Sequence, residues 1–484
     1  MNPIIDRLHA QASATPEAMA FFTMGRPTTF AQLQRLVTQM AEQLQDQGVQ
    51  PGHTVSLSVQ NPFMLACLSL ACMHRAAAVC VLPIGQPWPD SLSSQWLMAD
   101  HPVQPPAYLG KVVALDAAWL TALATQPGQL PAQAFEGPHA ICRLQQSSGS
   151  TGTPKSILLS VQTLHERALQ RHAKLPVSGG IIVLFDQSTL PGMHAAWRPL
   201  YTGQPTHLCP DLKAMWQVLA QQPLAYVSGS PAQLADLARM GESLNARAAR
   251  LEAVVTGGGP VREPLLHLLQ QRLCAEVLVR YASSEVGTVA VADTATLLSA
   301  PKAAGRVVPG VVVEVVDAQD QPLPPGQEGQ VRLRTPYMAH GYTQPQAEGF
   351  RDGWFYPGDL GVLDTTGLLH ITGRADHVIN LGGTKVNAQT VDDLLTSAPG
   401  VQEGLTTQAP DARGLPVMMC AVVPAPGFDM TAVRQHIEQA LPPALHPRWI
   451  IEVAQIPRTA SGKPDRAATA IDLLARLQAQ GVGL

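Results

Sequence analysis

The sequence has few charged and few aromatic residues, and neither sign of charge dominates. Charged residues make up 14% and aromatic residues 5% of the 484 residues, and the formal net charge is −4. Proteins that bind nucleic acids neutralise backbone phosphates with a strongly basic surface. The absence of a basic stripe argues against a nucleic-acid partner, and the few aromatic residues indicate no particular ring-binding pocket.

Cysteine is also scarce. The seven cysteines are odd in number and include no C-x-x-C pair, so neither a zinc site nor a secreted disulfide framework is expected. Most are predicted to be small buried hydrophobic residues. The N-terminus lacks a cationic start followed by an apolar core, so no signal peptide is expected.

One long apolar stretch, residues 63–84, could be mistaken for a membrane span. His74 and Arg75 interrupt it near its middle, where a membrane helix would bury them at high cost. A buried helix followed by a buried strand explains the stretch better. We therefore expect no membrane span and a cytoplasmic protein.

Hydrophobic periodicity places the chain in the α/β class. A chain of this length favours two to four domains at roughly 100–200 residues each. A helix is expected from the cap at Thr29 to Gly48, followed by a strand at 55–59. Helices and strands alternate again through 214–281, as in a parallel sheet covered by helices. After Lys302 short, half-exposed antiparallel strands are expected, and from about His377 a compact tail has its own α/β pattern.

A loop rich in glycine and hydroxyl side chains precedes Lys155. Residues 146–155 read QSSGSTGTPK. Glycines let backbone N–H groups approach an anion, hydroxyls donate hydrogen bonds, and the lysine supplies charge. Pro154 excludes a Walker A loop, which needs glycine at that position. The pattern predicts a phosphate-binding loop, and the alternative is a solvated turn.

Two serines and a glutamate, Ser283, Ser284 and Glu285, follow a predicted strand. Ligands of open α/β sheets bind at the carboxyl ends of strands. Serine hydroxyls can reach phosphate oxygens, and a glutamate carboxylate can hold Mg²⁺. The alternative is a serine cap that starts a helix with the glutamate in its first turn.

Two further motifs carry charged side chains. Asp359 can accept hydrogen bonds from both hydroxyls of a ribose, supported by Arg374 fifteen residues later; the alternative is an ordinary surface ion pair. Lys463, on the loop TASGK, can be delivered to a reacting phosphate and then withdrawn; the alternative is a simple exposed lysine.

In this order and spacing the four motifs resemble those of the acyl-adenylate-forming (AMP-binding) superfamily. Its members include acyl-CoA synthetases, peptide-synthetase adenylation domains and firefly-type luciferases, and stand-alone acyl or aryl acid ligases are the most similar. The resemblance covers nearly the whole chain. It implies a large N-terminal domain, residues 1–375, of layered α/β subdomains with a small β-barrel-like part. A smaller mobile α+β domain, residues 376–484, would follow, with the active site in the cleft between them.

The resemblance also assigns roles to residues. The phosphate loop comprises Ser147, Ser148, Gly149, Ser150, Thr151, Gly152, Thr153 and Lys155. The remaining ATP and AMP contacts are Gly258, Gly259, Tyr281, Ala282, Ser283, Asp359, Ile371 and Arg374. Ser284, Glu285 and Lys463 are the expected catalytic residues, with Glu285 also the metal ligand. Asp376 is the expected hinge, and Thr189, His194, Gly257 and Gly287 line the expected acyl and thiol channel.

The expected function is ATP- and Mg²⁺-dependent activation of a small-molecule carboxylic acid to acyl-AMP, followed by transfer of the acyl group to coenzyme A. Thr189 stands where acyl-CoA synthetases often have a gating histidine, which His194, one turn away, could replace. The acceptor therefore stays open between coenzyme A and a separate acyl carrier protein. Two further hypotheses are a luciferase-type oxidoreductase and a non-catalytic acyl or nucleotide sensor.

The acid itself is only partly specified. Leu190 occupies the position of the amine-binding aspartate of amino-acid-activating domains, so an acid without an α-amino group is expected. Its pocket should be formed by residues from roughly 190–200, 228–232 and 256–288. Mild departures from the family pattern occur at Ser156, Ala282, Ser284 and Pro357.

Overall fold

The structure, a computed structural model, divides the chain into two compact units. It describes residues 1–85, 88, 92–105, 109–147, 155–172, 175–344, 349–381, 384–411, 415–459 and 462–480. Unit 1 comprises residues 1–301, 307–312 and 334–350, and unit 2 comprises 302–306, 313–333 and 351–484. The boundary after residue 375 stays a prediction.

The first sheet of unit 1 has the strand order β6-β5-β3-β4-β7-β8. Its strands are β3 (Thr54–Ser58), β4 (Ala78–Val81), β5 (Ser94–Ala99), β6 (Leu109–Ala114), β7 (Ile141–Ser147) and β8 (Lys155–Ser160). All neighbours are parallel except β7 and β8. The Thr29 side chain forms a capping box with Gln32 at the start of α2 (Phe30–Gln47), which ends at Gly48 with φ 98°. Both ends of the helix were therefore predictable.

Helix α3 (Pro62–His74) lies in the core of unit 1. It is apolar around its whole circumference, and its residues from Leu65 to His74 are buried. The buried strand β4 follows it, so the prediction for residues 63–84 is confirmed. In the part of the chain that the structure describes, none of the helices has both the length and the apolar character needed to span a bilayer.

The second sheet region of unit 1 carries the predicted helix–strand alternation. Its strands run in the order β14-β13-β12-β11-β9-β10-β1-β2, and those from β13 to β1 are parallel. They are β1 (Met19–Thr23), β2 (Arg26–Thr29), β9 (Gly180–Val183), β10 (Thr206–Leu208), β11 (Pro223–Gly229), β12 (Arg250–Gly257), β13 (Val277–Ser283) and β14 (Gly287–Ala292).

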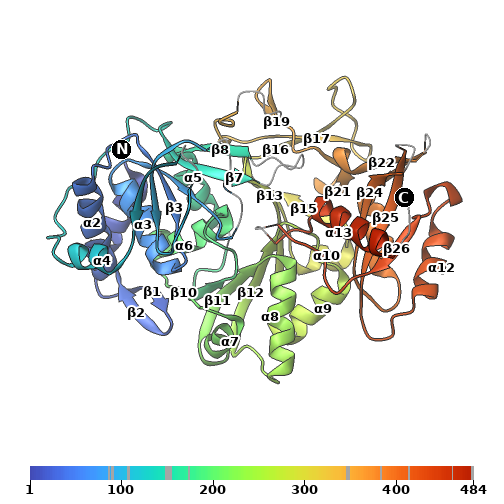
Figure 1. The fold of residues 1–484 in the computed structure, drawn as a ribbon, viewed down its shortest axis with the longest axis horizontal. Coiled ribbons are helices and arrows are strands. Elements are labelled where there is room, and N and C mark those ends of the chain that lie inside the picture. The colour runs from blue at the N-terminus through green and yellow to red at the C-terminus, as the bar shows by residue number, and fades with distance from the viewer. Residues whose placement is uncertain are drawn as a thin grey trace. The chain divides into compact units, whose positions relative to one another are not determined.

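Helices cover both faces of this sheet region. Helices α7 (Leu212–Gln221), α8 (Pro231–Ser243) and α9 (Glu263–Arg272) lie along β11 and β12 (Figure 1) and share one apolar core with Val227 and Val254. On the opposite face Ala195 of α6 (Leu190–Thr202) packs with Tyr226 and Val255. The other helices of this unit are α1 (Pro3–Ala14), α4 (Ala117–Ala124), α5 (Val161–His172) and α10 (Thr294–Ser299).

Unit 2 begins with antiparallel strands, as predicted. They are β15 (Ala303–Val307), β16 (Val312–Val316), β17 (Glu328–Arg334), β18 (Phe350–Arg351), β19 (Trp354–Phe355), β20 (Asp359–Leu363) and β21 (Leu368–Arg374). Strand β20 pairs with β17 and β21, and β15 pairs with β21. Among the described residues these strands form an open sheet and no closed barrel, which corrects the expectation of a barrel-like part.

The tail of unit 2 has its own sheets and helices. The hairpin β22 (Val378–Leu381) and β23 (Thr384–Asn387) is followed by β24 (Val401–Pro410), β25 (Pro416–Pro424) and β26 (Trp449–Glu452). Strands β24 and β25 are antiparallel, whereas β25 and β26 are parallel. The helices are α11 (Ala388–Ser397), α12 (Met430–Ala440) and α13 (Arg466–Ala479). The predicted α+β composition of the tail is confirmed.

The cysteines lie away from solvent. All seven are free; five are buried, and Cys209 and Cys274 are partly buried. Burial raises the pKa of each thiol, to about 11 for Cys80, Cys209 and Cys274 and higher for the others. The prediction of small buried hydrophobic residues is confirmed for most of them.

Candidate active site

Strands β7 and β8 flank the predicted phosphate loop. The two strands are antiparallel, and Ser147 pairs with Lys155. Ser148, Gly149, Ser150, Thr151, Gly152 and Thr153 lie outside the described residues. The Gln146 amide donates to the Ser156 hydroxyl at 2.9 Å, and Ser156 is fully buried. Serine in place of the family's usual glycine therefore helps to fix the base of the loop.

The segment Ser284–Glu285 forms the turn between β13 and β14. The Arg167 guanidinium on α5 donates to the carbonyl oxygens of Tyr337, Ser284 and Glu285 at 2.7–2.9 Å. The Glu285 carbonyl also accepts from the Ala339 N–H at 2.7 Å. The backbone of the predicted catalytic pair is thus held by one buried cation.

The alternative of a serine-capped helix at this position is wrong. Ser283 pairs with Gly287 across an antiparallel hairpin. Gly287 has φ 81°, a left-handed conformation that glycine adopts without steric cost. The chain therefore turns back into β14 instead of continuing as a helix.

The side chains of Glu285 and Lys155 both lie against Tyr342. The Tyr342 hydroxyl donates to Glu285 Oε1 at 3.0 Å, and Lys155 Nζ lies 5.3 Å from the centroid of the Tyr342 ring. Burial and the Glu285 charge raise the pKa of Tyr342. The structure thus brings the lysine of the loop and the predicted metal ligand to one tyrosine.

These residues fit the expected Mg²⁺·ATP. Mg²⁺ is usually bound by one or two carboxylates together with substrate phosphates, and Glu285 supplies such a carboxylate near Lys155. Arg167 and Tyr342 were not identified from the sequence. Arg167 belongs to none of the four motifs, and the only local signal for Tyr342 is an aromatic residue directly after Gly341.

The predicted adenine contacts lie at neighbouring strand ends. Tyr281, Ala282 and Ser283 close β13, and Gly257 at the end of β12 pairs with Arg280. A Cβ at Gly257 would lie 2.9 Å from the Arg280 carbonyl oxygen, and Gly258 has φ 85°. Gly257 therefore allows β12 and β13 to lie close together. Gly258, followed by Gly259, allows the chain to turn where nucleotide contacts were predicted from the sequence.

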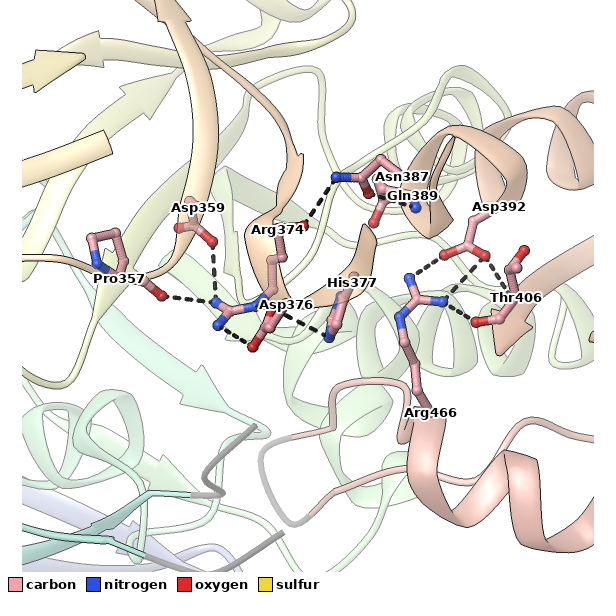
Figure 2. A network of polar contacts seen from close by, with 10 residues as sticks. All are labelled: Pro357, Asp359, Arg374, Asp376, His377, Asn387, Gln389, Asp392, Thr406 and Arg466. Carbon is pink, nitrogen blue, oxygen red and sulfur yellow. Dashed lines mark hydrogen bonds and ion pairs between the residues drawn. The ribbon is translucent and has the colours of Figure 1, made fainter. Parts of the chain in front are cut away.

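One guanidinium joins three of the predicted residues in unit 2. Asp359 at the start of β20 pairs in register with Arg374 at the end of β21. Arg374 Nη1 lies 3.1 Å from Asp359 Oδ1, while its Nε and Nη2 donate to the two Asp376 oxygens at 2.8 and 2.9 Å (Figure 2). Asp359 is only 8% exposed, which does not fit an ordinary surface pair. Ile371, also on β21, is partly exposed.

Lys463 lies on a tight turn just before α13. The Thr459 N–H donates to the Lys463 carbonyl at 2.8 Å, and the Lys463 N–H donates to Thr459 Oγ1 at 3.3 Å. The Lys463 side chain is exposed. The turn presents the lysine to solvent while its backbone is held.

A buried ion pair anchors the chain three residues further on. Arg466 at the start of α13 contacts Asp392 of α11 and the Thr406 carbonyl of β24 (Figure 2). Asp392 is 3% exposed and also accepts the Thr406 N–H at 2.5 Å. The Lys463 turn is therefore tied to the core of the tail.

The predicted channel residues on α6 have different surroundings. Thr189 caps α6: its side chain accepts the Gly192 N–H at 3.3 Å and donates to the Asp186 carbonyl at 2.7 Å. His194 is buried, with its ring edge-on to Trp197 at 6.3 Å between centroids. Thr189 thus serves the helix cap. In this segment His194 remains the candidate for the gating residue of the acyl and thiol channel.

The fold and these residues define a nucleotide-binding α/β enzyme. Residues 8–91 and 93–343 match the family model described as AMP-binding enzyme, and residues 390–463 match the AMP-binding enzyme C-terminal domain. The chain therefore belongs to the AMP-binding enzyme family, and the predicted resemblance is confirmed.

Relatives match over almost the whole chain. The chain is 28% identical to a feruloyl-CoA synthase of Amycolatopsis sp., covering 94% of this chain and 95% of the relative. It is also 28% identical to the indoleacetate–CoA ligase of Aromatoleum aromaticum, with 95% of each covered. The fold matches ATP-bound MatB of Rhodopseudomonas palustris with a TM-score of 0.85, at 20% identity and with 98% and 99% coverage; this match shows the fold alone.

Proposed function

We propose that the chain activates a carboxylic acid with Mg²⁺·ATP, releasing pyrophosphate, and transfers the acyl group to the thiol of coenzyme A. The family supports the adenylation step, and relatives named for acid–CoA ligation support the thioester step. The observation that carries the proposal is the turn Ser284–Glu285, held by Arg167 and lying beside Lys155 through Tyr342.

In the first step a carboxylate oxygen bonds to the α-phosphorus of ATP as the bond to pyrophosphate breaks. Negative charge spreads over the phosphoryl oxygens, so positioned positive charge supplies most of the acceleration. Lys155 would bind the leaving phosphates, and Lys463 would contact the α-phosphate and the attacking carboxylate. Glu285 would hold Mg²⁺, which supplies further positive charge when bound.

The predicted domain boundary gives Asp376 a role in the second step. Asp376 lies in a short 3-10 helix, Ala375–His377, and is bonded through both oxygens to Arg374. Rotation of residues 376–484 about this point would withdraw Lys463 after adenylation and break that pair. The thiol then attacks the acyl carbonyl carbon, and AMP leaves.

Coenzyme A is the acceptor in this proposal, and a separate acyl carrier protein is the rival outcome. Both present the same phosphopantetheine thiol, so every adenylation residue serves either acceptor. A cytoplasmic location is part of the proposal, since ATP and coenzyme A are both available there.

Carboxylate-dependent exchange between pyrophosphate and ATP tests the first step. We expect exchange with one class of acid in a panel of short, medium, long-chain, aromatic and dicarboxylic acids. Lys463→Ala should lower the rate by on the order of a hundredfold or more, while Lys213→Ala, at an exposed lysine of α7, should leave it unchanged. Binding of Mg²⁺·ATP without exchange by any acid would contradict the proposal and favour a sensor.

The acceptor is tested separately with a chemically synthesised acyl-adenylate of the preferred acid. Thioester formation should occur with coenzyme A and should persist in Lys463→Ala, since the lysine serves only the first step. Thioester formation with a phosphopantetheinylated carrier protein but not with coenzyme A would contradict the second half of the proposal.

A further inference from the structure

Three arginines of unit 1 gather around the side chain of Tyr226. Arg171 comes from α5, Arg198 from α6 and Arg280 from β13, while Tyr226 lies on β11. Arg198 and Tyr226 are both fully buried, and Arg198 Cζ lies 5.5 Å from the centroid of the tyrosine ring. Tyr226 acts on the pKa of all three guanidinium groups. Segments far apart in the sequence thus bring three cations to one tyrosine.

Several polar atoms of this cluster are buried without hydrogen-bond partners among the described residues. They are Arg171 Nε, Arg198 Nε and Nη1, and Arg280 Nη1. The Tyr226 hydroxyl makes no hydrogen bond of good geometry with them, although it lies near enough to Arg171 and Arg198 to raise their pKa. Hydrogen bonds of the cluster's other N–H groups within the described part of the chain go to neutral acceptors: Arg198 Nη2 donates to the Gly179 carbonyl at 2.9 Å and to the Pro176 carbonyl at 3.4 Å, and Arg280 donates to the Thr288 hydroxyl. Several N–H donors of the cluster are therefore without an acceptor in the described part of the chain.

Among the described residues no carboxylate balances the positive charge of the cluster. Burial lowers the pKa of all three arginines, and the charge of Arg171 lowers that of Arg280 further. Within the described part of the chain, Tyr226 is the only group that raises the pKa of any of the three arginines. Burying unpaired charges and unsatisfied donors is costly. A structural role alone would be served better by apolar side chains, whereas an anion would satisfy both the charge and the donors.

The cluster lies in the region expected to form the acyl pocket. Arg198 is four residues from His194 on α6, so the two share one side of the helix. Arg280 pairs in register with Gly257 on the parallel strand β12, so the side chain of Arg280 lies on the face of Gly257. Arg280 precedes Ser283 by three residues, roughly 10 Å at about 3.3 Å per residue. The cluster is therefore deeper in the unit than the strand end where adenylation is proposed.

We propose that the acid activated by this enzyme carries a second anionic group, a carboxylate, at its distal end, and that Arg198, Arg280 and Arg171 bind that group with the Tyr226 hydroxyl. This inference rests on the proposed function and names the substrate class. Guanidinium groups bind carboxylates through paired N–H donors. A fatty or neutral aryl acid would instead place apolar atoms against unpaired charges, which makes it a poor substrate.

Matched substrates test the inference directly. Pyrophosphate exchange is measured with malonate, succinate, glutarate, adipate and suberate, and with the monomethyl ester of each, which has similar length but a neutral distal end. The best diacid should exceed its monoester by about a hundredfold or more in kcat/KM, as for other buried charge pairs. Equal or better exchange with the monoesters overturns the proposal. Phosphono and sulfo analogues of the best diacid then show whether the site prefers a carboxylate or accepts any anion.

Substitutions in the arginine cluster test whether the cluster causes the preference for diacids. Arg198→Met and Arg280→Met should each lower kcat/KM for the diacid by about thirtyfold or more, and should raise or at least not lower kcat/KM for the monoester, whose neutral end then meets less unpaired charge. Arg250→Met, at an exposed arginine at the start of β12, is the matched control and should change neither. An equal loss for diacid and monoester overturns the proposal. Arg280 keeps part of its surface exposed, so its variant provides the test if Arg198→Met does not fold.

A binding measurement separates this inference from the proposed function. Calorimetric titration of diacid and monoester into the full chain saturated with AMP needs no turnover. Diacid binding that is lost in Arg280→Met, without exchange by any acid, supports the anion site and contradicts the proposed function. Exchange confined to neutral-ended acids supports the proposed function and overturns the anion site, as does the absence of diacid binding.

Discussion

Arg466 in unit 2 and Arg198 in unit 1 are both largely removed from solvent, but their partners differ. Arg466 contacts the buried Asp392 carboxylate and the Thr406 carbonyl. Arg198 donates to backbone carbonyls through Nη2, while Nε and Nη1 have no partner among the described residues. The paired arginine is satisfied by the fold itself. Among the described residues the unpaired arginine has no partner for these two nitrogens, and the proposed anion would supply one.

The difference provides a criterion for separating structural from ligand-binding charges. A buried ion pair becomes costly when one partner is removed, because the other is left uncompensated. When a buried cation has no carboxylate partner, its removal leaves no uncompensated buried charge behind. The same substitution, arginine to methionine, should therefore destabilise the protein strongly at Arg466 and leave its stability almost unchanged at Arg198.

Arg466→Met is expected to have the largest effect on stability. It leaves Asp392 buried without its counter-charge, so the free energy of unfolding should fall by about 3–5 kcal/mol. Chemical denaturation followed by circular dichroism measures the loss. Arg476→Met, on the same helix but in an exposed pair with Asp472, should cost no more than about 0.5 kcal/mol. If the two variants were similarly stable, the ion pair of Arg466 would not stabilise the fold, and its contrast with Arg198 would have no basis.

Arg167→Met tests an intermediate case, an arginine satisfied mainly by carbonyl groups. It removes the donors to the carbonyls of Ser284 and Glu285, each worth about 1.5–3 kcal/mol when the donor is charged. We expect kcat for pyrophosphate exchange to fall by at least about tenfold. Arg167→Lys, which keeps the charge but not the planar fork, should recover only part of the activity. An unchanged kcat in both variants would show that the turn is held without Arg167.

The pH dependence of stability probes the surroundings of the paired arginine. Burial and the neighbouring Arg466 and Arg374 lower the pKa of His377 from 6.5 to about 4, against the opposing charge of Asp376. The unfolded chain therefore binds a proton more readily, and stability should be lost as the pH falls from about 6.5 towards 4. The partly solvent-screened histidine should contribute roughly 1–2 kcal/mol. His377→Gln should reduce the loss, as should Arg466→Met; a pH profile unchanged by either would contradict this assignment.

Arg198→Met should have the smallest effect on stability. Removing a desolvated charge offsets the loss of the bond to the Gly179 carbonyl, so the free energy of unfolding should change by less than about 1 kcal/mol. The same denaturation measurement as for Arg466→Met gives the direct contrast. A loss as large as that of Arg466→Met would make Arg198 a structural residue.

Features that depend on nearby residues were predicted well. The capping box at Thr29, the glycine at the end of α2 and the helix–strand alternation from α7 to β13 all follow from local periodicity and caps. The family and its adenylate-forming chemistry followed from four short motifs, each of which can be identified without knowing its partners. The roles assigned to individual residues stay predictions.

Features that depend on distant pairing could not be predicted. Arg167 meets Glu285 across 118 positions of sequence, and no local pattern indicates that contact. The helix considered as the alternative after Ser283 is replaced by a hairpin because β14 pairs with β13. The arginine cluster escaped detection for the same reason, since its members come from four separate elements.

The burial of the cysteines matters for an enzyme that makes acyl-adenylates. Such mixed anhydrides react with thiolates, and a thiolate on the enzyme itself would compete with the intended acceptor. Here burial raises the pKa of every cysteine, so the thiols stay protonated at neutral pH. Buried, protonated thiols are poor nucleophiles towards an acyl-adenylate, and a single cysteine introduced on the surface could be labelled selectively to test the proposed rotation of residues 376–484.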